Sequence, residues 1–114
     1  MADFFQTWLR RALASPGVLA CGVRDQSDAF SVLTTQDGIP ESRVQEIMRR
    51  LGETVRALQQ NHIECDRLCW SLASGHVHCV LRPDGTMALL VAGFDPGAEA
   101  DIELLLRDFQ TGAQ

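Results

Sequence analysis

The sequence predicts an α+β fold in which three helices cover a five-stranded antiparallel sheet, in the order α-β-β-α-β-β-β-α. Apolar residues recur at helical spacing in three segments and form short or alternating runs in five others, patterns typical of helices and strands respectively. The connections between these segments are short, which favours antiparallel neighbours. Because the strands near Trp70 and Leu90 carry apolar side chains on both faces, helices must cover both faces of the sheet.

The first helix and a hairpin occupy the N-terminal part of the chain. Apolar residues at helical spacing predict a helix at residues 4–14, which ends before the stop signal Ser15-Pro16-Gly17. Two short apolar runs follow at residues 17–23 and 29–35. The polar turn RDQSD between these runs indicates a hairpin.

The longest helix is predicted at about residues 41–62. It follows a predicted turn at Asp37-Gly38 and begins near Pro40, where Ser42 and Gln45 have the spacing of a capping box. Its apolar stripe advances in steps of four and three residues, and Ile47 widens it. The stripe consists of Val44, Met48, Leu51, Val55, Leu58 and His62.

A three-stranded meander and a final helix complete the chain. Alternating residues predict a strand from Leu68 to Ala73, and runs at residues 76–82 and 86–93 predict two more. The turns Ser74-Gly75 and Pro83-Asp84-Gly85 separate them. Asp95 and Pro96 then predict the start of the last helix. Its apolar face consists of Ile102, Leu105, Leu106 and Phe109.

The composition excludes several kinds of chemistry. The chain has 114 residues, enough for one domain over residues 1–114, and a formal net charge of -5. All 10 basic residues are arginine, so a phosphate-loop lysine, a Schiff-base lysine and a lysine general base are impossible. An acidic chain without a basic stripe is also a poor candidate for nucleic-acid binding.

We expect the chain in the cytoplasm. No apolar run approaches the ~20 residues that cross a bilayer, which argues against membrane insertion. The N-terminus lacks the basic start and apolar block of a secretory signal. In the cytoplasm the 4 cysteines are expected as reduced thiols rather than disulfides.

The stretch CDRLCWSLASGHVHCV has the residue types of a metal site, namely Cys65, Cys69, His76, His78 and Cys79. Strand alternation places His76 and His78 on one face and Cys79 on the other, so one site cannot easily collect them. The favoured interpretation makes Cys69 and Cys79 small buried hydrophobic residues, with the histidines on a polar or interface face. We therefore expect no bound metal. The alternative is a thiol- or metal-dependent sensor.

Signals for an enzyme are nearly absent. His62-Ile63-Glu64 resembles the His-x-Glu of zinc deaminases, but the accompanying Pro-Cys-x-x-Cys does not occur in the sequence. Two pairs of carboxylates, Glu64 with Asp66 and Asp101 with Glu103, lie where solvated charge is expected. We therefore expect neither a catalytic residue nor a cofactor.

The spacing of apolar residues in the long helix is typical of a helix that packs against a second helix. Its apolar stripe follows the heptad spacing of a helix-helix interface. Gly52 lies beside the stripe, where glycine makes the helix less stable by about 1 kcal/mol than alanine would. A helix that keeps such a glycine is compatible with close approach of a second helix. Since two-fold dimers are the commonest soluble assembly, the pattern favours a homodimer over a helix that only packs on its own sheet.

Over nearly the whole chain, this order of elements resembles the roadblock family, the dynein light-chain type domain also found as small stand-alone bacterial proteins with a profilin-like arrangement. The resemblance rests on the helix at 4–14, the hairpin GVLACGV and AFSVLTT, the long helix after DGIPES, the meander and the helix after DPGAEAD. Apart from Gly17 and Gly22, the first hairpin lacks the glycine-rich sequence that is usual in the family. The cysteines are not an expected family feature either.

The resemblance implies a homodimer in which the long helix and the first strand of the meander meet their symmetry mates and two sheets fuse into one. It places the following residues at or next to the interface: Val44, Met48, Leu51, Gly52, Val55, Leu58, Leu68, Trp70 and Leu72. It also implies a regulator of small Ras-like GTPases or a scaffold subunit, without catalytic residues.

A different class of protein, the chaperones of secreted effectors, is also small, acidic, dimeric and α+β. Those chaperones are expected to place three strands before the central helix, whereas the sequence predicts two.

Overall fold

The computed structural model describes residues 2–27, 29–35 and 39–112, and the turn predicted at Asp37-Gly38 lies outside these residues. The predicted order of helices and strands is confirmed, with one additional 3-10 turn before the last helix. Each helix of the described residues is too short or too polar to cross a bilayer. The elements are α1 (Ala2–Ala14), β1 (Val18–Arg24), β2 (Phe30–Thr34), α2 (Glu41–Gln60), β3 (Arg67–Leu72), β4 (Gly75–Leu81), β5 (Met87–Gly93), η1 (Pro96–Ala98) and α3 (Glu99–Thr111).

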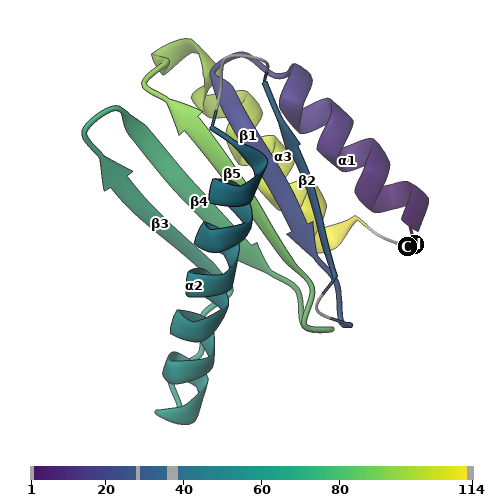
Figure 1. Ribbon diagram of the computed structural model, residues 1–114, viewed down its shortest axis with the longest axis vertical. Coiled ribbons are helices and arrows are strands. Elements are labelled where there is room, and N and C mark those ends of the chain that lie inside the picture. Colours follow the sequence, from purple (N-terminus) through teal and green to yellow (C-terminus); the bar gives the residue numbers. More distant parts are fainter. Residues whose placement is uncertain (1, 28, 36–38, 113–114) are drawn as a thin grey trace.

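The strands form one five-stranded sheet in the order β2-β1-β5-β4-β3, and every neighbouring pair is antiparallel. β5 lies at the centre between β1 and β4, while β2 and β3 form the two edges. Figure 1 shows α2 on one face of the sheet and α1 and α3 on the other. The predicted antiparallel sheet with helices on both faces is confirmed.

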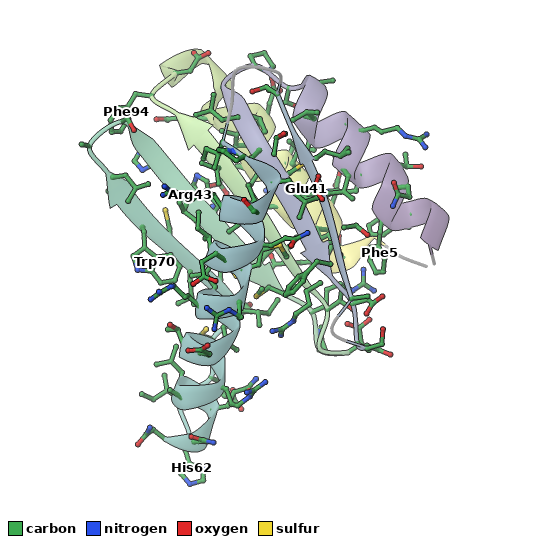
Figure 2. All side chains as sticks on the ribbon, viewed as in Figure 1. Phe5, Glu41, Arg43, His62, Trp70 and Phe94 are labelled. Carbon is green, nitrogen blue, oxygen red and sulfur yellow. The ribbon has the colours of Figure 1, made fainter. Side chains whose placement is uncertain are left out.

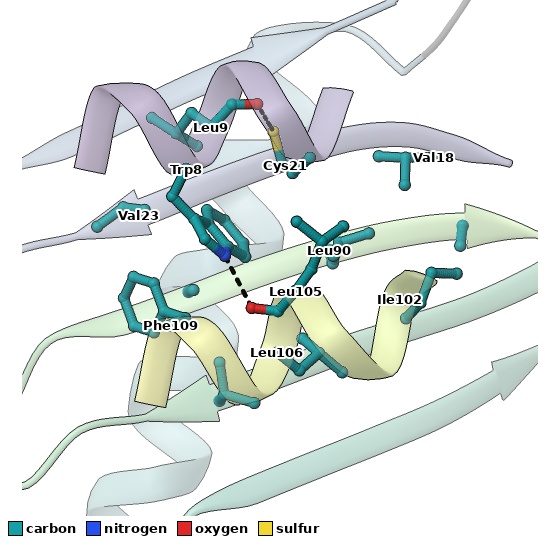
Figure 3. Packing of buried hydrophobic residues seen from close by; sticks show 14 of the residues in the cluster. Trp8, Leu9, Val18, Cys21, Val23, Leu90, Ile102, Leu105, Leu106 and Phe109 are labelled. Atoms are coloured by element: carbon teal, nitrogen blue, oxygen red, sulfur yellow. Dashed lines mark hydrogen bonds between the residues drawn. The ribbon is translucent and has the colours of Figure 1, made fainter. Parts of the chain in front are cut away.

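The core between the sheet and the helices α1 and α3 is built around aromatic residues (Figure 3). Trp8 of α1 packs edge-to-face on Phe109 of α3, and its indole Nε1 donates a hydrogen bond of 2.8 Å to the carbonyl of Leu105. Cys21 of β1 is fully buried here, and its thiol contacts the carbonyl of Leu9 at 3.4 Å. Burial raises the pKa of this thiol to about 12, so it acts as a small apolar side chain.

The other core lies between the sheet and α2. The apolar stripe of this helix packs on side chains from β1, β4 and β5. Met48 sits above Gly22 of β1, where the Cβ of any other residue would lie only 2.6 Å from the Met48 Sδ atom. A glycine on the strand therefore provides the space that a long side chain on the helix fills.

The start of α2 agrees with the prediction, but its capping and its C-terminal end differ. The helix begins at Glu41, so Ser42 lies inside it and cannot act as the capping residue. Pro40 occupies the N-cap position, and among the described residues no side chain makes a capping hydrogen bond there. The helix ends at Gln60 rather than near residue 62. There the Ile63 N–H donates to the Leu58 carbonyl at 2.9 Å, and His62 adopts a left-handed φ of 59°. The predicted helix start at Asp95 is confirmed, because its side chain accepts a hydrogen bond from the Gly97 N–H.

Candidate interaction surface

The edge strand β3 presents apolar side chains to solvent. It pairs with β4 along one side, and no strand of the described residues pairs with its other side. Trp70 is 36% exposed and Leu72 is 50% exposed. Trp70 lies opposite Val77, which belongs to the core under α2, so both exposed side chains are on the face that α2 covers further along the sheet. Figure 2 shows Trp70 on this outer strand.

The predicted interface residues fall into three groups by burial. Those of α2 are mostly enclosed by the chain's own sheet, namely Val44, Met48, Leu51, Gly52 and Val55. Leu58 and Leu68 are half-buried, and only Trp70 and Leu72 are exposed. A side chain already packed in the core is not available to a partner. The dimer interface stays a prediction, and its accessible part is centred on β3.

Gly52 has a partner within the chain. A Cβ at this position would overlap Nη1 of Arg24, so the guanidinium of this β1 residue occupies the space beside the helix. Close approach by a second helix is therefore not needed to explain the glycine. Sequence patterns missed this contact because the two residues lie far apart in the chain and neither belongs to a motif.

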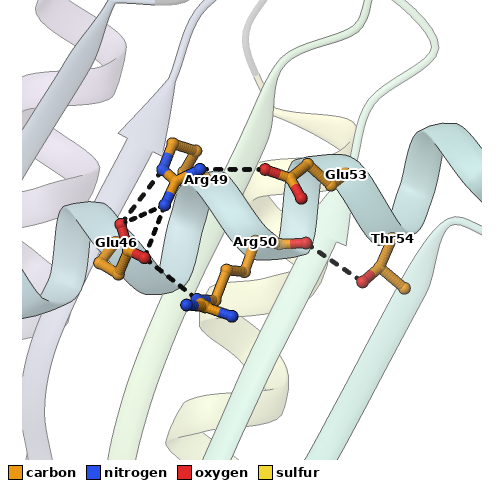
Figure 4. Close-up of polar contacts among 5 residues, drawn as sticks. All are labelled: Glu46, Arg49, Arg50, Glu53 and Thr54. Carbon is orange, nitrogen blue, oxygen red and sulfur yellow. Dashed lines mark hydrogen bonds and ion pairs between the residues drawn. The ribbon is translucent and has the colours of Figure 1, made fainter.

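The outward face of α2 carries a network of ion pairs (Figure 4). Glu46 contacts Arg49 at 2.6 Å and Arg50 at 3.1 Å, and Arg49 also contacts Glu53 at 3.1 Å. Hydrogen bonds from Arg49 and Arg50 lower the pKa of the Glu46 carboxyl. Exposed pairs of this kind contribute little stability, but they give the helix a charged surface with both signs close together.

Comparison with known proteins identifies the fold. No family model and no curated protein matches the chain. The structure of MglC from Myxococcus xanthus is similar, with a TM-score of 0.56 and 12% identity over 91% of this chain and 94% of that chain. A Roadblock/LC7 domain from Streptomyces avermitilis gives a TM-score of 0.55 and 12% identity over 95% of this chain and 92% of that chain. The chain has a roadblock-type fold.

The cysteines and histidines of this roadblock-type domain are distributed over both faces of the sheet. Cys69 lies opposite His78, and Ser71 lies opposite His76, so these side chains share the face of the sheet on which α3 packs. Cys79 is fully buried on the other face, as predicted. The prediction that Cys69 is buried is wrong: it is exposed, because it lies on an edge strand.

The placement of these residues and the pKa of the Cys79 thiol bear on metal binding by the roadblock-type domain. Among the described residues, no group of three or more His, Cys, Asp or Glu side chains is placed to hold a metal ion. Burial raises the pKa of the Cys79 thiol to about 12, whereas a thiol must lose its proton to bind a metal. Burial, with the nearby charges of Arg67 and His76, lowers the pKa of His78; because the neutral imidazole is the form that binds metals, this shift does not argue against a metal at His78.

The carboxylates considered from the sequence lie in different environments. Glu64 and Asp66 are exposed in the link between α2 and β3. Glu103 makes a two-pronged ion pair with Arg67, at 2.5 Å and 2.8 Å, which joins α3 to the start of β3. The hydrogen bonds from Arg67 lower the pKa of Glu103. A carboxylate held ionised in this way is suited to a structural contact and not to donating a proton.

Proposed function

We propose that this chain is a non-enzymatic homodimeric regulator or adaptor of a small Ras-like GTPase in the cytoplasm. The main support for a homodimer is the amino-acid composition of the open edge strand. From Leu68 to Leu72, β3 has no charged residue and no proline, the groups that usually protect such an edge from pairing. Trp70 and Leu72 add exposed apolar surface beside it.

Pairing of β3 with its symmetry mate would satisfy the open backbone groups and cover these side chains at the same time. Tryptophan is among the residues that dominate binding energy at protein interfaces. Leu68 on β3 and Leu58 on α2 are half-buried, so both keep some accessible apolar surface. A two-fold axis beside β3 would join two five-stranded sheets into one.

The GTPase partner is inferred from the resemblance to the roadblock family. The charged outward face of α2, with its network around Glu46 and Arg49, offers polar contacts to such a partner. Fold alone does not define function, so this part of the proposal needs a direct binding test. The chaperone hypothesis receives no support, because the described residues place two strands before α2 and not three.

The dimer is tested by light scattering coupled to gel filtration. The wild-type chain should be a dimer at micromolar concentration, and Trp70→Glu or Leu72→Glu should raise the dissociation constant at least about 100-fold, because a symmetric interface loses the residue twice. Substitutions of Met48 or Val55 are unsuitable, since both side chains are buried and a charge there would unfold the monomer.

Leu104→Glu is the matched control. Leu104 is 51% exposed, close to the 50% of Leu72, but it lies on α3. A monomeric wild type, or equal weakening by Leu104→Glu, would contradict the dimer.

The partner is then tested by affinity purification from cell extract with GDP or a non-hydrolysable GTP analogue. Enrichment of a small GTPase in a nucleotide-dependent manner supports the proposal, whereas enrichment of an unfolded effector segment would favour the chaperone class.

A further inference from the structure

Three residues in locally unfavourable environments line one cavity at the end of α2. The cavity has a volume of about 900 Å³ and lies between the C-terminal half of α2, the link to β3, the turn between β4 and β5, and the end of α3. Figure 1 shows this end of α2 extending past the end of the sheet. The three residues are Gly52, His62 and Arg82.

The first is Gly52, which holds open the space for Arg24. Glycine inside a helix costs about 1 kcal/mol relative to alanine, and here its missing Cβ leaves room for the Arg24 guanidinium. Both residues line the cavity. The helix therefore keeps an unfavourable residue where it positions a cation.

The second is Arg82, whose side chain is only 10% exposed. Its Nη1 donates to the Phe109 carbonyl at 3.1 Å, its Nε lies 3.4 Å from Asp84, and its guanidinium lies over the rings of Phe4 and Phe109. Removing an arginine from water is unfavourable unless other contacts replace the hydration. These contacts fix Arg82 from the α3 side of the sheet, while Arg24 approaches from the α2 side.

The third is His62, which has a left-handed backbone conformation at the far end of α2 (Figure 2). This conformation costs a non-glycine residue about 1 kcal/mol or more. Backbone strain of this kind clusters at functional sites, where the fold holds it in place. His62 lines the same cavity as the two arginines.

The charges of the cavity define the ligand. Arg24 and Arg56 supply guanidinium groups in a chain of net charge -5, and Arg82, whose own guanidinium is held by Phe109 and Asp84, adds positive charge to the lining. Guanidinium groups match the geometry of phosphate and carboxylate oxygens. Glu64 and Asp66 also line the cavity and can accept hydrogen bonds from hydroxyl groups. The volume is within the range of small-molecule sites.

We propose that this cavity binds a small hydroxylated organic anion, with its phosphate or carboxylate group at the arginines and its hydroxyl groups at Glu64 and Asp66. None of the residues that line this cavity lies on the open edge of β3 from Leu68 to Leu72, so ligand binding can be measured separately from pairing at that edge. The site adds a ligand-binding activity to the proposed adaptor.

Amide NMR titrations test the site with three probes at constant ionic strength: glycerol 3-phosphate, glycerate and neutral glycerol. We expect saturable shifts at the amides of Gly52, Gln59 and Gly85 with at least one of the two anions, and none with glycerol. Binding of only the phosphate or only the carboxylate compound identifies the chemical class. Absence of saturable shifts with both anions at about 10 mM overturns the proposal.

Two variants locate the anion, and a third is the control. Arg56→Gln, on the exposed surface of α2, should weaken binding about 10-fold by removing one charge-assisted contact. Gly52→Ala should also weaken it, because the methyl group displaces the Arg24 guanidinium, while the helix itself gains stability. Arg43→Gln, near the opposite end of α2 (Figure 2), should bind like the wild type. Equal weakening by Arg43→Gln would indicate non-specific attraction and overturn the site.

Discussion

His62 shows how a single residue can conflict with its local conformation. The hydrogen bond from the Ile63 N–H to the Leu58 carbonyl closes the last turn of α2 and requires a left-handed residue just before Ile63. Glycine usually occupies such a position because it has no Cβ to clash with the backbone. Here histidine occupies it, at the rim of the arginine-lined cavity.

We predict that His62→Gly stabilises the chain by about 1 kcal/mol, because it removes the left-handed strain while keeping the helix end. The free energy of unfolding in urea, followed by circular dichroism, measures the effect. Gln60→Gly is the matched control, since Gln60 is the last residue of α2 and is also exposed. That change should destabilise the chain by up to about 1 kcal/mol. Destabilisation by His62→Gly would show that the histidine side chain outweighs the strain.

At the scale of the elements, β3 is an edge strand, as β2 is. Its ladder joins it to β4 alone, whereas β5 is paired on both sides. Two further contacts hold its start: the ion pair of Arg67 with Glu103, and a hydrogen bond from Gln110 to the carbonyl of Asp66 at 3.1 Å. Exposed ion pairs contribute little, so pairing with a second copy would add stabilisation to β3.

Hydrogen exchange measures this attachment. In dilute solution, where the monomer dominates, alternate amides of β3 should exchange much faster than those of β5, because one side of an edge strand has no hydrogen-bonding partner. Raising the protein concentration through the dimerisation range should protect the amides of β3 and leave those of β5 unchanged. Protection of β3 that does not depend on concentration would argue against pairing at this edge.

At the scale of the whole molecule, stability depends on two separate cores joined by one sheet. The α2 core is aliphatic, while the core under α1 and α3 is aromatic and contains the hydrogen bond from Trp8 to Leu105. This bond connects two helices that are distant in the sequence and adjacent in space. Trp8 therefore couples the first helix to the last.

We predict that Trp8→Phe destabilises the chain by about 1–3 kcal/mol, because it removes a buried hydrogen bond and leaves unfilled volume beside Phe109. Thermal and urea unfolding, monitored by far-ultraviolet circular dichroism, measure the loss. Trp70→Phe makes the same chemical change at an exposed position and should leave the stability of the monomer nearly unchanged. Equal effects of the two substitutions would show that the Trp8 contact does not bind α1 to α3.

The order of the elements could be predicted from the sequence because each pattern is local. Steps of three and four residues in α2, the alternation around Trp70, and Asp95 before Pro96 each depend on neighbouring side chains. The capping box was wrong because Ser42 lies inside the helix, and spacing alone does not fix where a helix begins. The buried position of Cys79 was predicted correctly, whereas that of Cys69 was not, since alternation does not tell an edge strand from a central one.

The sequence by itself determined the α+β class, the number and order of its elements, and the residue types that exclude lysine chemistry. The tertiary structure decided which elements are neighbours: β5 lies between β1 and β4, and β3 is left with an open edge. It also decided that the stripe of α2 covers the chain's own sheet and that Gly52 accommodates Arg24. The physical reason is that periodicity reports only the local environment of a side chain, whereas strand pairing, cavities and charge clusters depend on contacts between distant segments.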